Sequence, residues 1–201
     1  MHKFLTLEGI LLIIGYLVLA FLIVWFISLF KYKNDDETRR YFFLGFGFKM
    51  ACCLGYALIY DFYYGWAGDT YIYYLSSQRL GMVLFQDPAS YFRIIFDTID
   101  SNNINTLASG LAYYPVLRDP SRYAVHRFLS PFAIMGGANY YTVNICLSVF
   151  LFLLNWKFFQ YIRTKINCSD KAAFICVMLI PSVGSWSSAL MKDSFTFPFT
   201  P

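Results

Sequence analysis

Four apolar stretches recur along the chain, and each has about the length of a membrane-spanning helix. The stretch 9–30 contains no charged residue over 22 positions, enough to cross about 30 Å of hydrocarbon at about 1.5 Å per residue. Three further stretches, 41–64, 140–161 and 172–191, are predicted to span the membrane as well. The first is too long for the apolar core of a signal peptide and is followed by Lys31 and Lys33, which predicts a retained anchor.

The composition supports this interpretation. Hydrophobic residues make up 58% of the chain and charged residues only 14%, whereas a soluble domain carries about 25% charged residues. One core in water could not bury so much apolar surface, which excludes a soluble enzyme, a disordered tail and a small disulfide scaffold. The predicted fold class is all-α: a polytopic helical membrane protein with about four transmembrane helices, in a single integral membrane domain over 1–201.

The distribution of positive charge predicts the topology. The net charge is +4, but the cations flank the apolar stretches, so no nucleic-acid partner is expected. The loops 31–40 and 163–171 are rich in lysine and arginine and belong on the cytoplasmic side by the positive-inside rule. The N-terminus and the long segment 65–139 then lie outside, and the four spans alternate consistently.

The external segment 65–139 is expected to contain interfacial helices. Asp87 suits a helix N-cap and Pro88 the first helical position, so 70–97 is predicted to form two helices lying on the membrane. The apolar run 128–135 is too short to span. Gly136 and Gly137 predict a turn before the third span.

Lys49 lies within the second apolar stretch, where a cation is expensive. One interpretation is that the helix starts late and that Lys49 extends to nearby headgroups. The other is an ion pair inside the helix bundle, for which Asp61 lies too far along the same helix.

Two short motifs carry candidate chemistry. The motif YYGWAGDTYIYY (63–74) contains Asp69, and PSVGSWSSALMKDS (181–194) contains Trp186, Lys192 and Asp193. The predicted topology places both motifs at the external face, where they could form one site around a sugar phosphate, with Asp69 and Lys192 about 6–12 Å apart. The competing interpretation is that Asp69 is a helix N-cap and that Lys192 and Asp193 are membrane-boundary residues. His126 is the only histidine beyond the N-terminus, so a Ser-His-Asp hydrolase has no support.

The stretches FKMACCLGYALIYDFYYGWAGDTYIYY (48–74) and PSVGSWSSALMKDSF (181–195) resemble polytopic bacterial membrane proteins related to GT-C-type glycosyltransferases and surface-polysaccharide assembly proteins. The resemblance implies a multi-pass protein of the bacterial inner (cytoplasmic) membrane and a polyprenyl-phosphate-linked sugar donor in cell-envelope glycan assembly. Asp69 matches the family's aspartate in the first external loop. An extra span precedes it here, and FTFPFTP (195–201) looks like the opening of a fifth span. The chain is therefore expected to be the N-terminal portion of a longer protein.

The resemblance implies roles for several side chains. Asp69 would accept the proton of an acceptor hydroxyl, or would help to bind a divalent metal ion beside the phosphate. Cations would neutralise the lipid phosphate and aromatic rings would stack on the sugar, with Asp193 as a further substrate contact. The candidate cations are Arg79, Arg118, Arg122, Arg127 and Lys192, and the candidate aromatic residues are Trp66, Tyr71 and Trp186.

Two other classes of function remain open. One is a non-catalytic membrane scaffold or flippase subunit, in which Asp69 and Lys192 are structural. The other is a transporter that uses Lys49 as an intramembrane ionisable site. Sugar transfer predicts that Asp69 is indispensable and that Lys49 tolerates arginine, and a transporter predicts the reverse.

Overall fold

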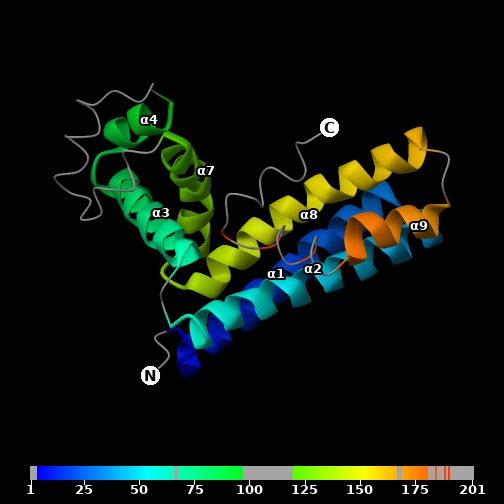
Figure 1. Cartoon of the computed structure of the whole chain (residues 1–201), viewed down its shortest axis with the longest axis horizontal. Coiled ribbons are helices and arrows are strands. Elements are labelled where there is room, and N and C mark those ends of the chain that lie inside the picture. The colour runs from blue at the N-terminus through cyan, green and yellow to red at the C-terminus, as the bar shows by residue number, and fades with distance from the viewer. Residues whose placement is uncertain are drawn as a thin grey trace.

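The computed structural model describes residues 4–65, 68–96, 120–166 and 169–180, together with 184, 188 and 190, and for 120–122 it describes the backbone alone. Within these residues all regular secondary structure is helical (Figure 1). The elements are α1 (Leu7–Lys31), α2 (Asp36–Phe62), α3 (Asp69–Gln86), α4 (Pro88–Phe96), α7 (Pro120–Gly136), α8 (Tyr140–Lys165), α9 (Asp170–Phe174) and the π-helix η1 (Ile175–Leu179).

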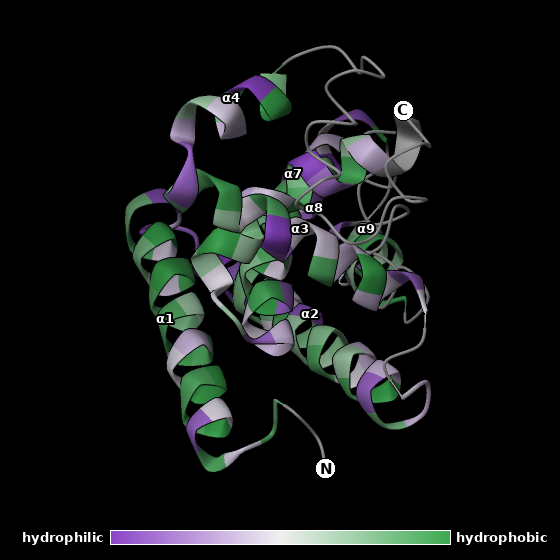
Figure 2. Ribbon diagram, turned by 90° about the vertical axis from the view of Figure 1, so that its left-hand side faces the viewer, coloured by the Kyte–Doolittle hydropathy of each residue, from purple (hydrophilic) through white to green (hydrophobic). Residues whose placement is uncertain are grey.

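Three helices of the described chain, α1, α2 and α8, are long and apolar enough to cross a membrane. Their axes run in roughly the same direction in Figure 1, and α8 packs against both of the others. Most of α1 is coloured as hydrophobic in Figure 2, and many of its large apolar side chains are exposed. A soluble monomer rarely exposes so large a contiguous apolar surface, so the structure supports the membrane class.

Polar caps fix where these helices begin. The Asp35 carboxylate accepts a hydrogen bond from the Thr38 backbone N–H at 2.9 Å, and hydrogen bonding by Thr38 lowers the pKa of Asp35. Because of this cap, α2 begins at Asp36, five residues before the predicted span 41–64. Asn139 caps α8 in the same way through the Tyr141 N–H, at 2.9 Å, which confirms the predicted start at residue 140.

The predicted span 172–191 is not a continuous helix. α9 and η1 together cover ten residues, about 15 Å of helix, and Ile180 is extended. Ile180 precedes Pro181, and a residue before proline is disfavoured in the α conformation. The broken end expected from Pro181 is therefore confirmed. Beyond Ile180 the structure describes only Gly184, Ser188 and Leu190, which are buried.

The helices α3, α4 and α7 form a group beside the first turns of α8 (Figure 1). The prediction of two helices over 70–97 is confirmed for the described residues 69–96. Asp87 acts as the predicted cap, because its carboxylate accepts the Ser90 N–H at 3.2 Å, and hydrogen bonds from Ser90 lower the pKa of Asp87. Pro88 is the first residue of α4. The location of these helices at a membrane interface stays a prediction.

The apolar run 128–135 belongs to the longer helix α7, which contains Pro131. α7 ends at Gly136, and Gly137 follows with φ +66°, a left-handed conformation that favours glycine. The turn predicted at these two glycines is therefore confirmed.

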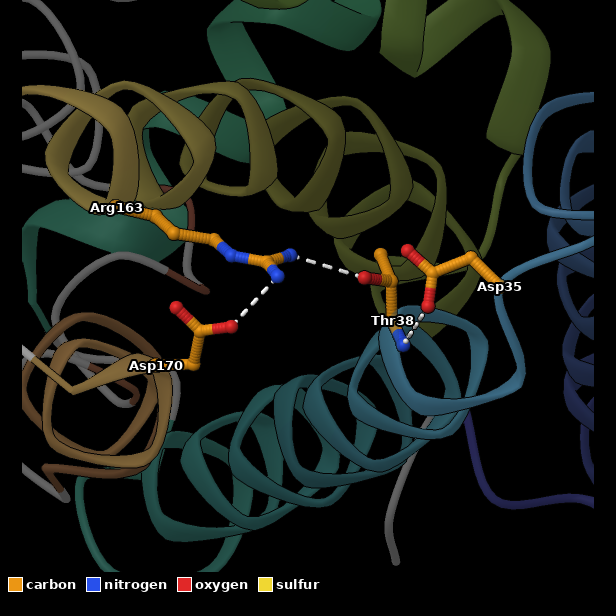
Figure 3. Close-up of polar contacts among 4 residues, drawn as sticks. All are labelled: Asp35, Thr38, Arg163 and Asp170. Atoms are coloured by element: carbon orange, nitrogen blue, oxygen red, sulfur yellow. Dashed lines mark hydrogen bonds and ion pairs between the residues drawn. The ribbon is translucent and has the colours of Figure 1, made fainter.

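Polar contacts show which loops share an end of the bundle. The Arg163 guanidinium donates to the Thr38 hydroxyl at 2.9 Å and pairs with the Asp170 carboxylate at 2.6 Å (Figure 3). This network joins α8, the start of α2 and the start of α9, so the two basic loops lie at one end. At the other end the Asn139 side chain donates to the Phe4 carbonyl at 3.3 Å. The chain thus alternates between the two ends of the bundle, as predicted. Which end faces the cytoplasm stays a prediction.

Thiol labelling would test the orientation. In a background without native cysteines, we expect an impermeant thiol reagent applied to intact cells to label an Ala89→Cys variant and not an Asn34→Cys variant. Both positions are exposed, Ala89 in α4 and Asn34 in the loop before α2. Labelling of Asn34→Cys alone would show that the predicted orientation is inverted.

Candidate functional site at the junction of α2 and α3

Asp69 is the first residue of α3, and its side chain is exposed. The N-cap position belongs to Gly68, which has φ +116° and makes no side-chain cap. The interpretation of Asp69 as the N-cap is therefore wrong. Its carboxylate instead lies in the first turn, where the helix dipole favours negative charge. Asp69 is thus an accessible carboxylate just beyond the end of the membrane-length helix α2.

A second carboxylate, Asp61, lies buried in the last turn of α2. Its side chain is only 4% exposed, and the Tyr141 hydroxyl donates a hydrogen bond to Asp61 Oδ2 at 2.6 Å. Burial of a carboxylate is unfavourable unless hydrogen bonds replace those to water. This bond therefore ties the end of α2 to the start of α8.

The neighbouring tyrosine of α8 makes a parallel contact with α3. The Tyr140 hydroxyl donates to the Thr70 hydroxyl at 3.2 Å, and Thr70 is fully buried. Consecutive residues of α8 thus contact the end of α2 and the start of α3. Because Thr70 follows Asp69 directly, these contacts set where the Asp69 carboxylate lies relative to the bundle.

A small cavity separates these elements. Its volume is about 10 Å³, and it is lined by Tyr60, Asp61, Thr70, Tyr71 and Tyr140. This is about the space that one water molecule needs, so a sugar does not fit inside. Burial raises the pKa of the Tyr71 hydroxyl, which keeps it protonated and able to donate. A substrate of Asp69 would therefore lie at the surface, outside this cavity.

Of the predicted cations, the structure describes the side chains of Arg79 and Arg127. Arg79 is half-buried on α3, ten residues after Asp69, roughly 15 Å along the helix. Arg127 is half-buried on α7, and its guanidinium carbon lies 4.5 Å from the centre of the Tyr123 ring. Tyr123 belongs to a small apolar cluster with Leu80, Tyr91 and Ile94, which joins α3, α4 and α7.

Several predicted site residues cannot be placed in this geometry. Trp66, Arg118, Trp186, Lys192, Asp193 and the side chain of Arg122 lie outside the described residues. The predicted proximity of Asp69 and Lys192 therefore stays a prediction.

Sequence reasoning missed the pairing of Asp61 with Tyr141 and that of Thr70 with Tyr140. It considered Asp61 only as a distant neighbour of Lys49, and it took Tyr140 and Tyr141 only as the start of a span. The available signal was the ionisable group itself, since an aspartate within an apolar helix is expensive and needs a partner.

Lys49 lies in the interior of the bundle. α2 begins thirteen residues earlier, roughly 20 Å along its axis, and Lys49 is only 4% exposed. The interpretation of a late helix start with Lys49 reaching the headgroups is therefore wrong.

The described residues contain no group of three or more His, Cys, Asp or Glu side chains that could hold a metal ion. Mg²⁺ in phosphate-handling sites is often bound by one or two carboxylates together with substrate phosphates. A metal-binding role of Asp69 would thus depend on the phosphate of the substrate as a further ligand.

Comparisons with protein-family models, with curated proteins and with solved structures found no match.

The Asp61–Tyr141 contact can be tested by removing one hydroxyl. We expect Tyr141→Phe to lower the free energy of unfolding by about 1 kcal/mol, because it removes a donor from a buried carboxylate. Thermal unfolding in detergent would measure the effect. Tyr161→Phe is the control, because Tyr161 is exposed near the other end of α8. Equal midpoints for the two variants would contradict the importance of this hydrogen bond.

Proposed function

We propose that this chain is a membrane-embedded, glycosyltransferase-like protein that acts on a polyprenyl-phosphate-linked sugar. The observation that carries the proposal is the exposed Asp69 carboxylate, which follows a membrane-length helix and begins a group of shorter helices. A lipid-linked sugar has its chain in the bilayer and its reacting carbon at the surface. A carboxylate just past the end of α2 would lie at the level of that reacting carbon.

The proposed reaction is a single displacement at the anomeric carbon. An acceptor hydroxyl attacks, its oxygen forms the new bond to carbon, and Asp69 takes the proton. The bond from the anomeric carbon to the phosphate oxygen breaks, and the polyprenyl phosphate leaves with the electron pair. A single base that activates the acceptor suits inversion rather than a covalent intermediate. Arg79, Arg127 and Lys192 are the candidate cations for the phosphate.

The buried contacts support this role of Asp69. A base must be held in position to be effective, and Thr70, the next residue, is buried and hydrogen-bonded to α8. The side chain of Asp69 nevertheless remains exposed, so an acceptor can reach it. An enzyme that acts at the membrane surface needs such a reacting group, which is exposed while its backbone is held in place.

The direct test is sugar transfer by the purified protein in nanodiscs. The donor would be a labelled farnesyl-phosphate hexose, offered as glucose, galactose, mannose and N-acetylglucosamine derivatives, and release of farnesyl phosphate would be measured. Donor-dependent release that requires the protein would support the proposal. Absence of both binding and release for all four donors would overturn it.

A transporter is the second candidate, and the burial of Lys49 favours it. Intramembrane ionisable residues commonly mark transport pathways. Lys49→Met separates the two functions, because methionine keeps the length of the side chain and removes its charge. Sugar transfer should survive this change, whereas transport through a Lys49 site should be lost.

A further inference from the structure

Three tyrosines form a stacked column that begins on α2 and ends two residues past it. The ring centroids of Tyr56 and Tyr60 are 4.6 Å apart, and those of Tyr60 and Tyr64 are 4.7 Å apart, with an interplanar angle of 26° in each pair. The spacing of four residues places the rings one above another on one helix face. The column leads along α2 toward the start of α3.

The column ends in an exposed aromatic corner. Tyr63 is 81% exposed and Tyr64 is 48% exposed, and their ring centroids lie 5.0 Å apart at an interplanar angle of 84°. Two nearly perpendicular rings thus present open surface at the end of α2.

The corner lies beside the start of α3. A Cβ atom built on Gly68 would be 3.1 Å from Tyr60 Cε1, so the backbone directly before Asp69 packs against the middle ring of the column. Tyr64 is one turn further along the same face. This contact therefore brings the residue before Asp69 against Tyr60, whose ring stacks on that of Tyr64.

Exposed tyrosine rings and a carboxylate together are complementary to a sugar. A pyranose ring has an apolar C–H face, which packs on an aromatic ring, and a rim of hydroxyl groups, which donate to a carboxylate. Membrane anchoring explains tyrosines at this level of the protein, but it requires neither a stacked column nor a perpendicular corner. Packing on Tyr60 also holds the Tyr64 ring in place before binding, which lowers the entropy lost when a ligand orders it.

We propose that Tyr63 and Tyr64 form a sugar-stacking subsite beside Asp69, occupied by the hexose ring of a lipid-linked sugar. The proposal rests on the proposed function and deepens it, because it names the part of the donor that these rings contact. It also explains where the sugar lies, since the neighbouring cavity has a volume of only about 10 Å³ and cannot enclose it.

The test measures binding to the protein in nanodiscs with two kinds of probe: the four farnesyl-phosphate hexoses, and farnesyl phosphate without a sugar. The variants are Tyr64→Leu and Tyr63→Leu, which remove a ring and keep an apolar side chain, and Tyr64→Phe, which keeps the ring. Tyr161→Leu is the matched control, because Tyr161 is also exposed (60%) but lies toward the other end of α8.

We expect Tyr64→Leu and Tyr63→Leu each to weaken binding of at least one farnesyl-phosphate hexose on the order of tenfold, since stacking on a ring supplies about that much. Binding of farnesyl phosphate should not change, and Tyr64→Phe and Tyr161→Leu should behave like the native protein. Equal weakening of both probes, or no weakening of either, would overturn the subsite and leave the proposed function standing. If the native protein binds none of the hexose probes, both the subsite and the proposed function fail.

Discussion

Replacement of Asp69 by asparagine is expected to lower sugar transfer by about 10²–10⁴-fold, the range that loss of a general base produces. Asparagine keeps the shape of the side chain and cannot accept the proton of the acceptor hydroxyl. Asp69 is exposed and makes no helix cap, so membrane insertion and thermal stability should be close to native. Initial rates of transfer in nanodiscs would measure the effect.

Asp36→Asn is the matched control for this experiment. Asp36 is also exposed and is also the first residue of a helix, but it lies at the opposite end of α2. Both substitutions remove the same charge from a helix N-terminus, so a general electrostatic effect would appear in both. If transfer is unchanged in Asp69→Asn, or falls equally in the two variants, Asp69 is not the base.

Replacement of Gly136 by alanine is expected to lower the stability of the folded protein substantially. A Cβ atom at this position would lie 2.6 Å from both the Cα and the backbone nitrogen of Val143. No change of rotamer can relieve a contact with backbone, so the end of α7 would have to move away from the first turn of α8. Overpacking of this kind typically lowers the free energy of unfolding by about 1–3 kcal/mol or more.

Gly47→Ala provides the comparison, because no atom lies within 4 Å of a Cβ built on Gly47. Alanine is also the better helix former, so this variant should unfold at or above the native midpoint in detergent. A midpoint for Gly136→Ala as high as that of Gly47→Ala would show that α7 and α8 do not approach as closely as described.

The helices were predictable where a local rule determines them. The stretch 9–30 is free of charge, and lipid leaves such a segment almost no alternative to helix. Asp87 and Pro88 form a local start signal, and Pro181 ends the helix before it for a steric reason. Each of these predictions depended only on residues that are continuous in the sequence, and that is why each was correct.

The buried polar contacts could not be predicted in the same way. The hydrogen bond between Asp61 and Tyr141 joins residues eighty positions apart, and its partner depends on how α2 and α8 are rotated against each other. The interpretation of Lys49 was wrong for a related reason. Hydropathy alone predicts a later start of α2, whereas the Asp35 cap starts the helix at Asp36. For the site, the sequence identified Asp69 itself but not Tyr140 of α8, which positions the neighbouring Thr70.

The packing of α1 and α2 on α8 has a consequence for assembly during synthesis. Both helices contact α8 more extensively than each other, and residues 63–139 separate α8 from α2. At about 5–20 residues per second, a ribosome needs roughly 4–15 s to make that interval. During this time α1 and α2 lack their main packing partner, and other molecules must cover the surface that α8 will occupy. The Arg163 network can close only after Asp170 has emerged, which makes it a late event of maturation.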